Sequence, residues 1–201
     1  SSTAVSNFRR GYTLFYTNDY KNEVGDDEQL KIIQGFLEDE TFPINSRQEV
    51  NKHLFKTPLN VVITNSDPER EFVRELCKKE NSKNIIAWIK SRDTGFYSIE
   101  YSYREGEHSK QKNFNPDFFI KTKHNDMIYY LVIEIKEDKD DSIENRAKYK
   151  YGKEHFNKLN KAMEKEGINE RYIFHFLSPN GYGAFFTYLN DGRLFDRFKY
   201  E

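Results

Sequence analysis

A predicted β-hairpin near the middle of the chain constrains the fold more than any other feature. Two runs rich in apolar residues, 116–123 and 127–136, are joined by a polar segment at 123–126. This pattern is typical of two antiparallel strands with a short turn. In the second run, M-I-Y-Y-L-V-I-E-I-K, alternation places Glu134 and Lys136 on the same face. Because that strand is otherwise apolar, the acid and the base form either a surface ion pair or part of a functional site.

The first strand of the hairpin carries another acid, Asp117, in N-F-N-P-D-F-F-I. Closing the hairpin pairs Asp117 with Val132 or Ile133, within about one residue of Glu134. Two converging carboxylates repel each other unless a proton or a cation lies between them. A hard divalent ion that keeps several waters is the usual solution, and it can activate water and neutralise a phosphate. The hairpin therefore predicts a metal site, with Lys136 near enough to orient the water or stabilise the phosphate.

A predicted helix over residues 68–79 contributes a third acid. Ser66 is a candidate N-cap, and a proline follows in the first turn. Glu69 lies on the same stripe of this helix as Phe72 and Leu76. Glu69 is therefore either an inward-facing carboxylate that needs a partner or a solvated residue at the helix end.

The longest predicted helix, about 143–166, is basic and is ended by a glycine. Lys148 and His155 fall on its apolar stripe. Lys148 could reach the site and bind a phosphate, whereas His155 is either a hydrogen-bonded structural residue or a functional one. Lys150 and Lys153 lie off the stripe, where they either form a solvated face or contact a nucleic-acid backbone.

The remaining pattern predicts an α/β fold with a mixed sheet flanked by helices. We expect one domain over residues 61–201 and an N-terminal extension over 1–60. The other expected elements are a strand or hairpin at 8–17, an acidic helix at 26–40, a short helix at 47–56, a strand at 59–64, two strands within 84–103 around a turn at 92–95, and strands at 171–177 and 182–189.

Composition excludes several classes of protein. The 201 residues carry a net charge of -1, which argues against binding of polyanions through global charge. The single cysteine, Cys77, excludes a disulfide scaffold and fits the reducing cytoplasm. No apolar run reaches the roughly 18 residues of a membrane span. No phosphate-binding loop is present, so we expect no ATP site. The chain begins at Ser1 without methionine, so we expect it to be a fragment of a longer protein.

These residues match a nuclease motif. Pro116-Asp117, then Glu134 at 17 positions after Asp117, then Ile135-Lys136 spell the PD-(D/E)XK pattern. Further blocks occur in a consistent order and spacing at 52–55, 65–76 and 145–159. Over about residues 50–160, the chain resembles the C-terminal endonuclease domain of the restriction subunits of type III restriction enzymes.

The resemblance implies a restriction-endonuclease-like fold and a set of roles. It makes Asp117, Glu134 and Glu69 the metal ligands, together with the backbone carbonyl of Ile135, and it makes Lys136 the catalytic lysine. Lys148 and His155 match family positions on the following helix. The implied cofactor is Mg²⁺, with Mn²⁺ as a possible substitute.

The resemblance also implies a setting. The family cuts double-stranded DNA in a longer chain that carries a helicase-like ATPase motor, and its partner is a methylating, sequence-reading subunit. One site per chain implies transient pairing of two copies for a double-strand break. The acidic run at 137–141 departs from the glycine-rich segment common in the family. It could disfavour DNA at the rim of the site or shift the substrate preference.

Two alternatives stay open beside a DNA endonuclease of an anti-phage restriction system. One is a non-catalytic domain that keeps the nuclease fold and docks on nucleic acid or on another subunit. The other is a nuclease of the same fold that acts on RNA or single-stranded DNA.

Overall fold

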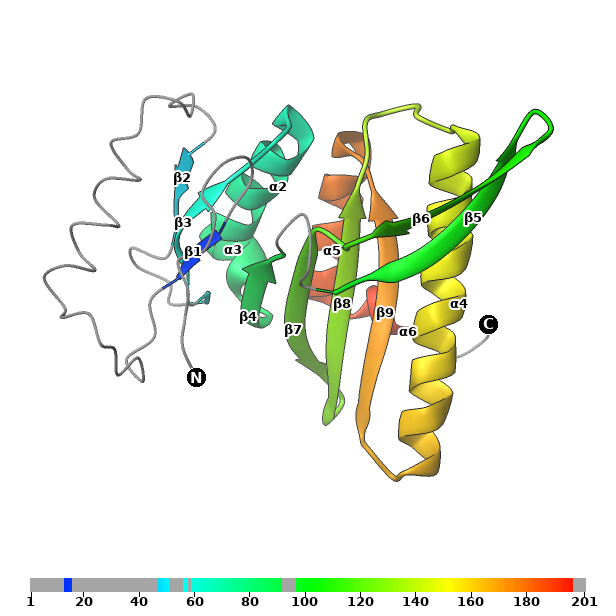
Figure 1. Ribbon diagram of the computed structural model, residues 1–201. Helices are drawn as coiled ribbons and strands as arrows, with labels where there is room; N and C mark the ends of the chain where they lie inside the picture. Colours follow the sequence, from blue (N-terminus) through cyan, green and yellow to red (C-terminus); the bar gives the residue numbers. More distant parts are fainter. Residues whose placement is uncertain (1–12, 16–46, 51–55, 58, 92–96, 197–201) are drawn as a thin grey trace, which may run out of the picture.

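The computed structural model describes residues 13–15, 47–50, 56–57, 59–91 and 97–196 (Figure 1). These residues form a mixed α/β fold whose centre is a four-stranded sheet in the order β4-β7-β8-β9. The α/β class with a mixed sheet flanked by helices is therefore confirmed. None of the helices within the described ranges is long and apolar enough to cross a membrane.

The central sheet combines antiparallel and parallel pairing. Its strands are β4 (Ile85–Lys90), β7 (Phe118–His124), β8 (Met127–Ile135) and β9 (Glu170–Leu177). Strands β4, β7 and β8 pair antiparallel in turn, whereas β8 and β9 are parallel. A parallel pair needs a crossover, and helix α4 (Ile143–Lys165) supplies it.

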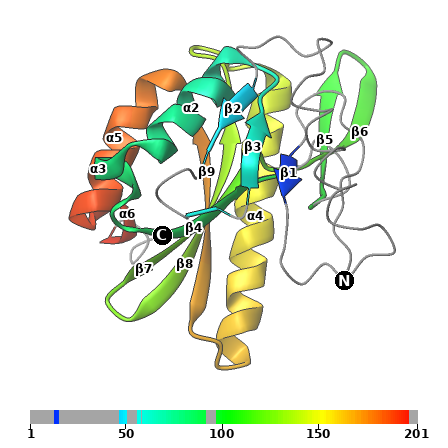
Figure 2. The ribbon, with the colours of Figure 1, turned by 90° about the vertical axis from the view of Figure 1, so that its left-hand side faces the viewer.

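Helices cover the two faces of this sheet unequally (Figure 2). On one side lie α2 (Asp67–Cys77), α3 (Lys79–Ser82), α5 (Pro179–Asp191) and α6 (Arg193–Asp196). On the other side lie α4 and a separate hairpin of β5 (Ile99–Glu105) and β6 (His108–Phe114). A third, three-stranded sheet has the order β1-β3-β2, from Thr13–Phe15, Leu59–Ile63 and Arg47–Glu49.

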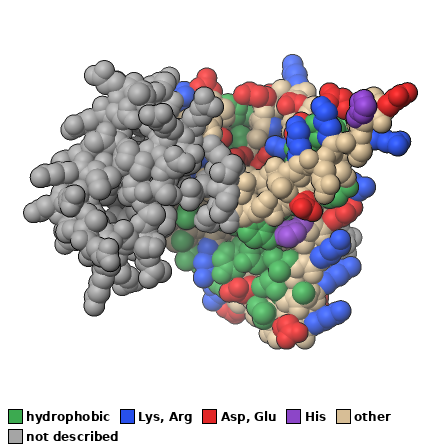
Figure 3. All heavy atoms as spheres, viewed as in Figure 1, with side chains coloured by type: hydrophobic (Ala, Val, Ile, Leu, Met, Phe, Trp, Pro, Cys, Tyr) green, Lys and Arg blue, Asp and Glu red, His purple; other side chains and the backbone are tan. Residues whose placement is uncertain are grey.

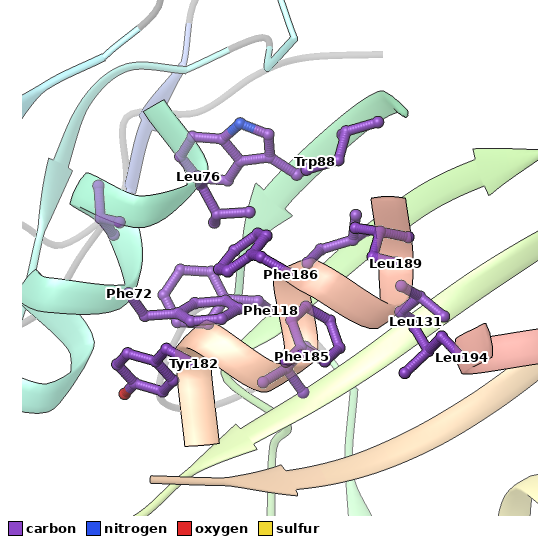
Figure 4. Close-up of a cluster of buried hydrophobic side chains, with 14 of the residues drawn as sticks. Phe72, Leu76, Trp88, Phe118, Leu131, Tyr182, Phe185, Phe186, Leu189 and Leu194 are labelled. Atoms are coloured by element: carbon purple, nitrogen blue, oxygen red, sulfur yellow. The ribbon is translucent and has the colours of Figure 1, made fainter. Parts of the chain in front are cut away.

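Each face of the central sheet buries its own apolar cluster. The larger cluster lies between the sheet and helices α2 and α5, where Phe72 contacts Phe118, Tyr182 and Phe186 (Figure 4). The second cluster lies on the α4 side and is centred on Phe156, which is 1% exposed. These two clusters fix the positions of α2 and α4 relative to the strands between them.

The predicted hairpin and its two flanking helices are present. Phe118 pairs with Ile133 across β7 and β8. Asn125 and Asp126 both have positive φ, at 46° and 64°, as a two-residue turn of the primed type requires. Ser66 caps α2 by accepting a hydrogen bond from the amide of Glu69, as the sequence predicts.

Two sequence-based predictions are wrong. Residues 182–189 form part of α5 and not a strand. The buried side chains Tyr182, Phe185, Phe186 and Leu189 recur with helical spacing, and Ser178 and Pro179 form the helix start. The short helix expected at 47–56 is also wrong where it can be compared, because Arg47–Glu49 is strand β2.

Other expected elements are present with different partners or lie outside the described residues. The two strands expected within 84–103 are β4 and β5, but they belong to different sheets. Strand β5 pairs with β6, which the sequence did not indicate because six of its seven residues are exposed and its sequence, H-S-K-Q-K-N-F, is polar. The expected helix at 26–40 lies outside the described residues, as does most of 8–17.

Candidate metal centre

Asp117 lies where β7 begins and β8 ends. Phe118 pairs with Ile133, so Asp117 lies one step further along the ladder, beside Glu134. Its Oδ2 atom accepts a hydrogen bond of 2.7 Å from the backbone amide of Ile135. In a strand, the amide and the carbonyl of one residue point toward the same neighbour, so the Ile135 carbonyl also faces Asp117. The hairpin thus brings together Asp117, Glu134 and the Ile135 backbone, as the sequence predicts.

Glu134 is buried and only half satisfied. The residue is 5% exposed, and its Oε1 atom lies 2.9 Å from the ammonium of Lys148 on α4. Its Oε2 atom is buried and has no hydrogen-bond partner among the described residues. A buried carboxylate oxygen without a partner is costly, so a ligand for this atom would stabilise the site.

Glu69 points inward from α2 and has a cationic partner. The residue is 8% exposed, and its Oε2 atom lies 3.3 Å from the ammonium of Lys90. The amide of Asn65 donates to the same oxygen over 3.1 Å. The inward reading of Glu69 is therefore confirmed. Its partner Lys90 was not singled out from the sequence, although it ends a strongly apolar strand, I-I-A-W-I-K.

The electrostatics of the cluster reflect an excess of negative charge. Burial raises the pKa of Asp117 well above its usual value, and the charges of Glu134 and Glu69 raise it further. Lys90 and the amide of Ile135 act in the opposite direction. Burial also raises the pKa of Glu134, against the opposing charge of Lys148.

The donor set fits a hard divalent cation. Three carboxylates face two ammonium groups, so one negative charge is in excess when all five groups are ionised. Carboxylate and carbonyl oxygens are the ligands that Mg²⁺ takes in proteins. Within the described ranges, no three acidic, histidine or cysteine side chains are already gathered tightly enough to hold an ion. Asp117, Glu134 and the Ile135 carbonyl would therefore hold it together with water.

Lys136 lies beside the cluster but contacts other groups. Its ammonium donates a 2.8 Å hydrogen bond to the carbonyl of Asp140 and lies 5.6 Å from the centre of the Phe176 ring. The acidic run that follows is partly structural. The carboxylate of Asp138 accepts from the amide of Asn180, in the first turn of α5, over 3.2 Å. That carboxylate acts as the side-chain cap that Ser178 does not supply.

The other candidate residues lie further along α4. His155 Nε2 and the hydroxyl of Tyr97 lie 2.6 Å apart, and burial lowers the pKa of His155. Lys150 is exposed and lies against the ring of Tyr151. Lys153 lines a groove of about 890 Å³ between α4 and β9. His155 and Lys150 thus lie against the aromatic residues Tyr97 and Tyr151.

A further acid, Glu144, anchors the β5–β6 hairpin to the first turn of α4. Its carboxylate accepts hydrogen bonds from Tyr101 and Tyr103 and an ion-paired one from Lys112 at 3.0 Å. The hydrogen bond from Tyr101 is the main reason why the pKa of Glu144 is lowered to about 2. Glu144 therefore has a structural explanation and is not needed for the metal site.

The comparisons with known proteins assign neither a family nor a function to this chain. No family model matches the chain, and no curated protein matches it significantly. The crystal structure of protein VC1899 from Vibrio cholerae is similar at 11% sequence identity and a TM-score of 0.25, over 85% of this chain and 45% of that one. The chain thus spans less than half of that structure, and a likeness this weak bears on neither fold nor function.

Proposed function

We propose that this chain is the cleavage domain of a metal-dependent endonuclease that hydrolyses phosphodiester bonds. The observation that carries the proposal is the buried, unpartnered Oε2 atom of Glu134 beside Asp117. A docking domain gains nothing from a half-satisfied buried carboxylate next to another acid, because both groups cost free energy. A bound cation would offset that cost and give the two acids a shared role.

In this proposal, each residue at the strand ends has one task. Asp117, Glu134 and the Ile135 carbonyl hold the ion. When bound, Mg²⁺ lowers the pKa of a coordinated water and neutralises charge on the phosphate. Lys148 holds Glu134 in position through its Oε1 atom. Lys136 turns from the carbonyl of Asp140 toward the phosphate or the water. This rearrangement is small, because the ammonium exchanges a single hydrogen bond to a neutral group.

A basic surface that follows α4 away from the carboxylates would suit a phosphate backbone. Lys and Arg side chains gather along α4 on the face shown in Figure 3. Lys150 and Lys153 would contact the backbone, and His155 would add a contact where it is open to solvent. Such contacts are independent of base sequence and weaken as salt is raised.

We propose double-stranded DNA as the substrate, on the strength of the resemblance to type III restriction subunits. On the same basis, the natural partners are a helicase-like ATPase motor in the same longer chain or complex and a modification methyltransferase subunit. Two copies would pair transiently to cut both strands.

Metal binding tests the proposal most directly. Calorimetric titration with Mg²⁺ and Mn²⁺ should show binding by the wild type and loss of binding in Asp117→Ala. The matched control is Glu137→Ala, which removes an exposed acid from the adjacent loop and should bind normally. Absence of binding in all three proteins would favour the docking domain.

Cleavage assays then define the substrate. With Mg²⁺, the wild type should nick supercoiled plasmid, and Glu134→Gln should not. Cleavage of single-stranded DNA or RNA in place of the plasmid would favour the alternative nuclease. Normal nicking by Glu134→Gln would contradict the assignment of the site.

A further inference from the structure

Lys90, the last residue of β4, is a buried lysine that the proposed mechanism does not use. Its side chain is 1% exposed, and its ammonium lies 3.3 Å from Glu69 Oε2. It also lies 5.6 Å from the centre of the Phe118 ring. Lysine is almost never fully buried unless its charge is paired, and an aromatic face adds to the stabilisation. The Lys90 ammonium is therefore a fixed positive charge inside the molecule.

The acid that faces Lys90 is also held in place. The amide of Asn65 donates to Glu69 Oε2, and the Glu69 amide donates to the hydroxyl of Ser66 over 3.4 Å. The Glu69 side chain is 11% exposed. Because Glu69 is fixed at the start of α2 and Lys90 at the end of β4, the pair is part of the packed structure.

Lys90 acts on the two proposed ligands as a metal ion would. It lies at the same end of the sheet, because the amide of the next residue, Ser91, donates a hydrogen bond of 2.8 Å to the carbonyl of Asp117. Strands β4 and β7 place Lys90 opposite Phe118, the residue next to Asp117. In two-metal nuclease sites, a second ion lies about 3.5–4 Å from the first and shares its carboxylates. The Lys90 ammonium lies 3.3 Å from Glu69 Oε2 and so takes the position of a cation bound to that acid.

We infer that Lys90 takes the place of a second metal ion beside Glu69, so that this site binds one divalent cation, between Asp117 and Glu134. This inference rests on the proposed metal-dependent function and refines it. It also changes the role of Glu69, which the resemblance assigns to the metal but which binds Lys90 in the structure. A second divalent ion here would have to share Glu69 with an ammonium that is already fixed, and the two positive charges would repel.

The number of ions bound per chain tests this inference without any measurement of activity. We expect titration calorimetry with Mn²⁺ to give one equivalent for the wild type. Lys90→Met keeps a side chain of similar length without the charge, and we expect two equivalents because Glu69 becomes available. The double variant Glu69→Gln/Lys90→Met should return to one. Lys139→Met removes an exposed lysine from the loop after β8 and should stay at one, as the control.

The measured stoichiometries test the role of Lys90 separately from the proposed nuclease function. Two equivalents in the wild type, or one in Lys90→Met, would overturn the role of Lys90 and leave a metal-dependent nuclease standing. Absence of Mn²⁺ binding by the wild type would contradict the proposed function itself.

Folding of the variants is followed by circular dichroism with and without Mn²⁺. If Lys90→Met folds only with Mn²⁺, the ion replaces the ammonium and the inference is supported. If neither Lys90→Met nor the double variant folds with Mn²⁺, Lys90 is a structural requirement and the inference is wrong.

Discussion

Two carboxylate–lysine pairs flank Asp117, and they differ in how far water reaches them. In the pair on the α2 side, Glu69 is 11% exposed and Lys90 is 1% exposed. In the pair on the α4 side, Glu134 is 7% exposed and Lys148 is 23% exposed. The nitrogen–oxygen distances are similar, at 3.3 and 2.9 Å. The two acids are similarly buried, whereas the two lysines differ in their access to water. The Glu69–Lys90 pair is therefore fixed, and the Glu134–Lys148 pair can open.

The two pairs also differ in whether a carboxylate oxygen is left for a ligand. On the α2 side, the amide of Asn65 and the ammonium of Lys90 share one oxygen of Glu69, and the lysine has no exit to solvent. On the α4 side, Lys148 uses one oxygen of Glu134 and leaves the other without a partner. A cation would therefore enter beside Glu134 and leave the Glu69 pair unchanged.

The largest expected effect comes from the aromatic residues that anchor the two helices. Phe72→Ala on α2 and Phe156→Ala on α4 should each lower the free energy of unfolding by about 3–5 kcal/mol, because both rings are fully buried. Urea unfolding followed by circular dichroism measures the loss. Ile143→Ala, at a side chain that is 55% exposed, is the control and should stay within about 0.5 kcal/mol. A small loss in either Phe variant would mean that its helix is held in another way.

The next effect distinguishes the two pairs directly. Without metal, Lys90→Met should lower the free energy of unfolding by about 3 kcal/mol, because it leaves a buried acid uncompensated. Lys148→Met also leaves a buried acid, Glu134, without its cation, but it should cost less, about 1–2 kcal/mol, because Lys148 is 23% exposed and water can take the place of its ammonium. Both values come from the same urea titration. Equal losses would mean that burial does not separate the pairs.

The sequence predicted the parts of this site that depend on strand alternation. Asp117, Glu134 and the turn between their strands follow from a period of two and a hairpin, both local properties. Lys90 could not be recognised in this way, because only the pairing of β4 with β7 brings it beside Asp117, and that pairing joins segments 28 residues apart (Lys90 with Phe118). The polar strand β6 was missed for a related reason, since its register with β5 and not its own pattern makes it a strand.

The error at 182–189 has a different cause. Its aromatic and apolar residues fit either period over a short run, and the expected turn at Pro179 to Gly181 favoured a strand. In the structure, this turn is the first turn of α5, and the Asp138 carboxylate caps it. The cap comes from a loop 42 residues away, so no local pattern could indicate it.

A third, smaller effect concerns Lys136, whose contacts differ from those expected of a catalytic lysine. We expect Lys136→Ala to lower plasmid nicking about 10²-fold while the Mn²⁺ stoichiometry stays at one, because it removes a charge near the phosphate and no ligand. Lys139→Asn, in the neighbouring loop, is the control and should cut normally. Normal nicking by Lys136→Ala would mean that this lysine serves only to bind Asp140 and Phe176, and that Lys90 and Lys148 are the lysines of the site.

The smallest expected effect concerns Asp117, which lies between the two pairs. Its pKa is raised in the folded protein, so the folded state binds this proton more tightly than the unfolded state does. The stability that the protonated form contributes is present below the unfolded pKa of about 3.9 and is lost as pH rises through the folded pKa. Asp117→Asn should therefore raise the free energy of unfolding at pH 8, on the order of 1 kcal/mol without metal, and have little effect at pH 4.

Glu144 is the control of opposite sign, because its partners lower its pKa to about 2. Its contribution is present above its unfolded pKa and is lost as pH falls through the folded value, so Glu144→Gln should destabilise the protein at pH 7 and have little effect near pH 2. The loss should be below about 1 kcal/mol, because the pair with Lys112 is open to water. If Asp117→Asn followed the pH dependence of Glu144→Gln, the Asp117 carboxylate would be stabilised by its neighbours in the folded protein. The site would then have no excess negative charge for a cation to neutralise.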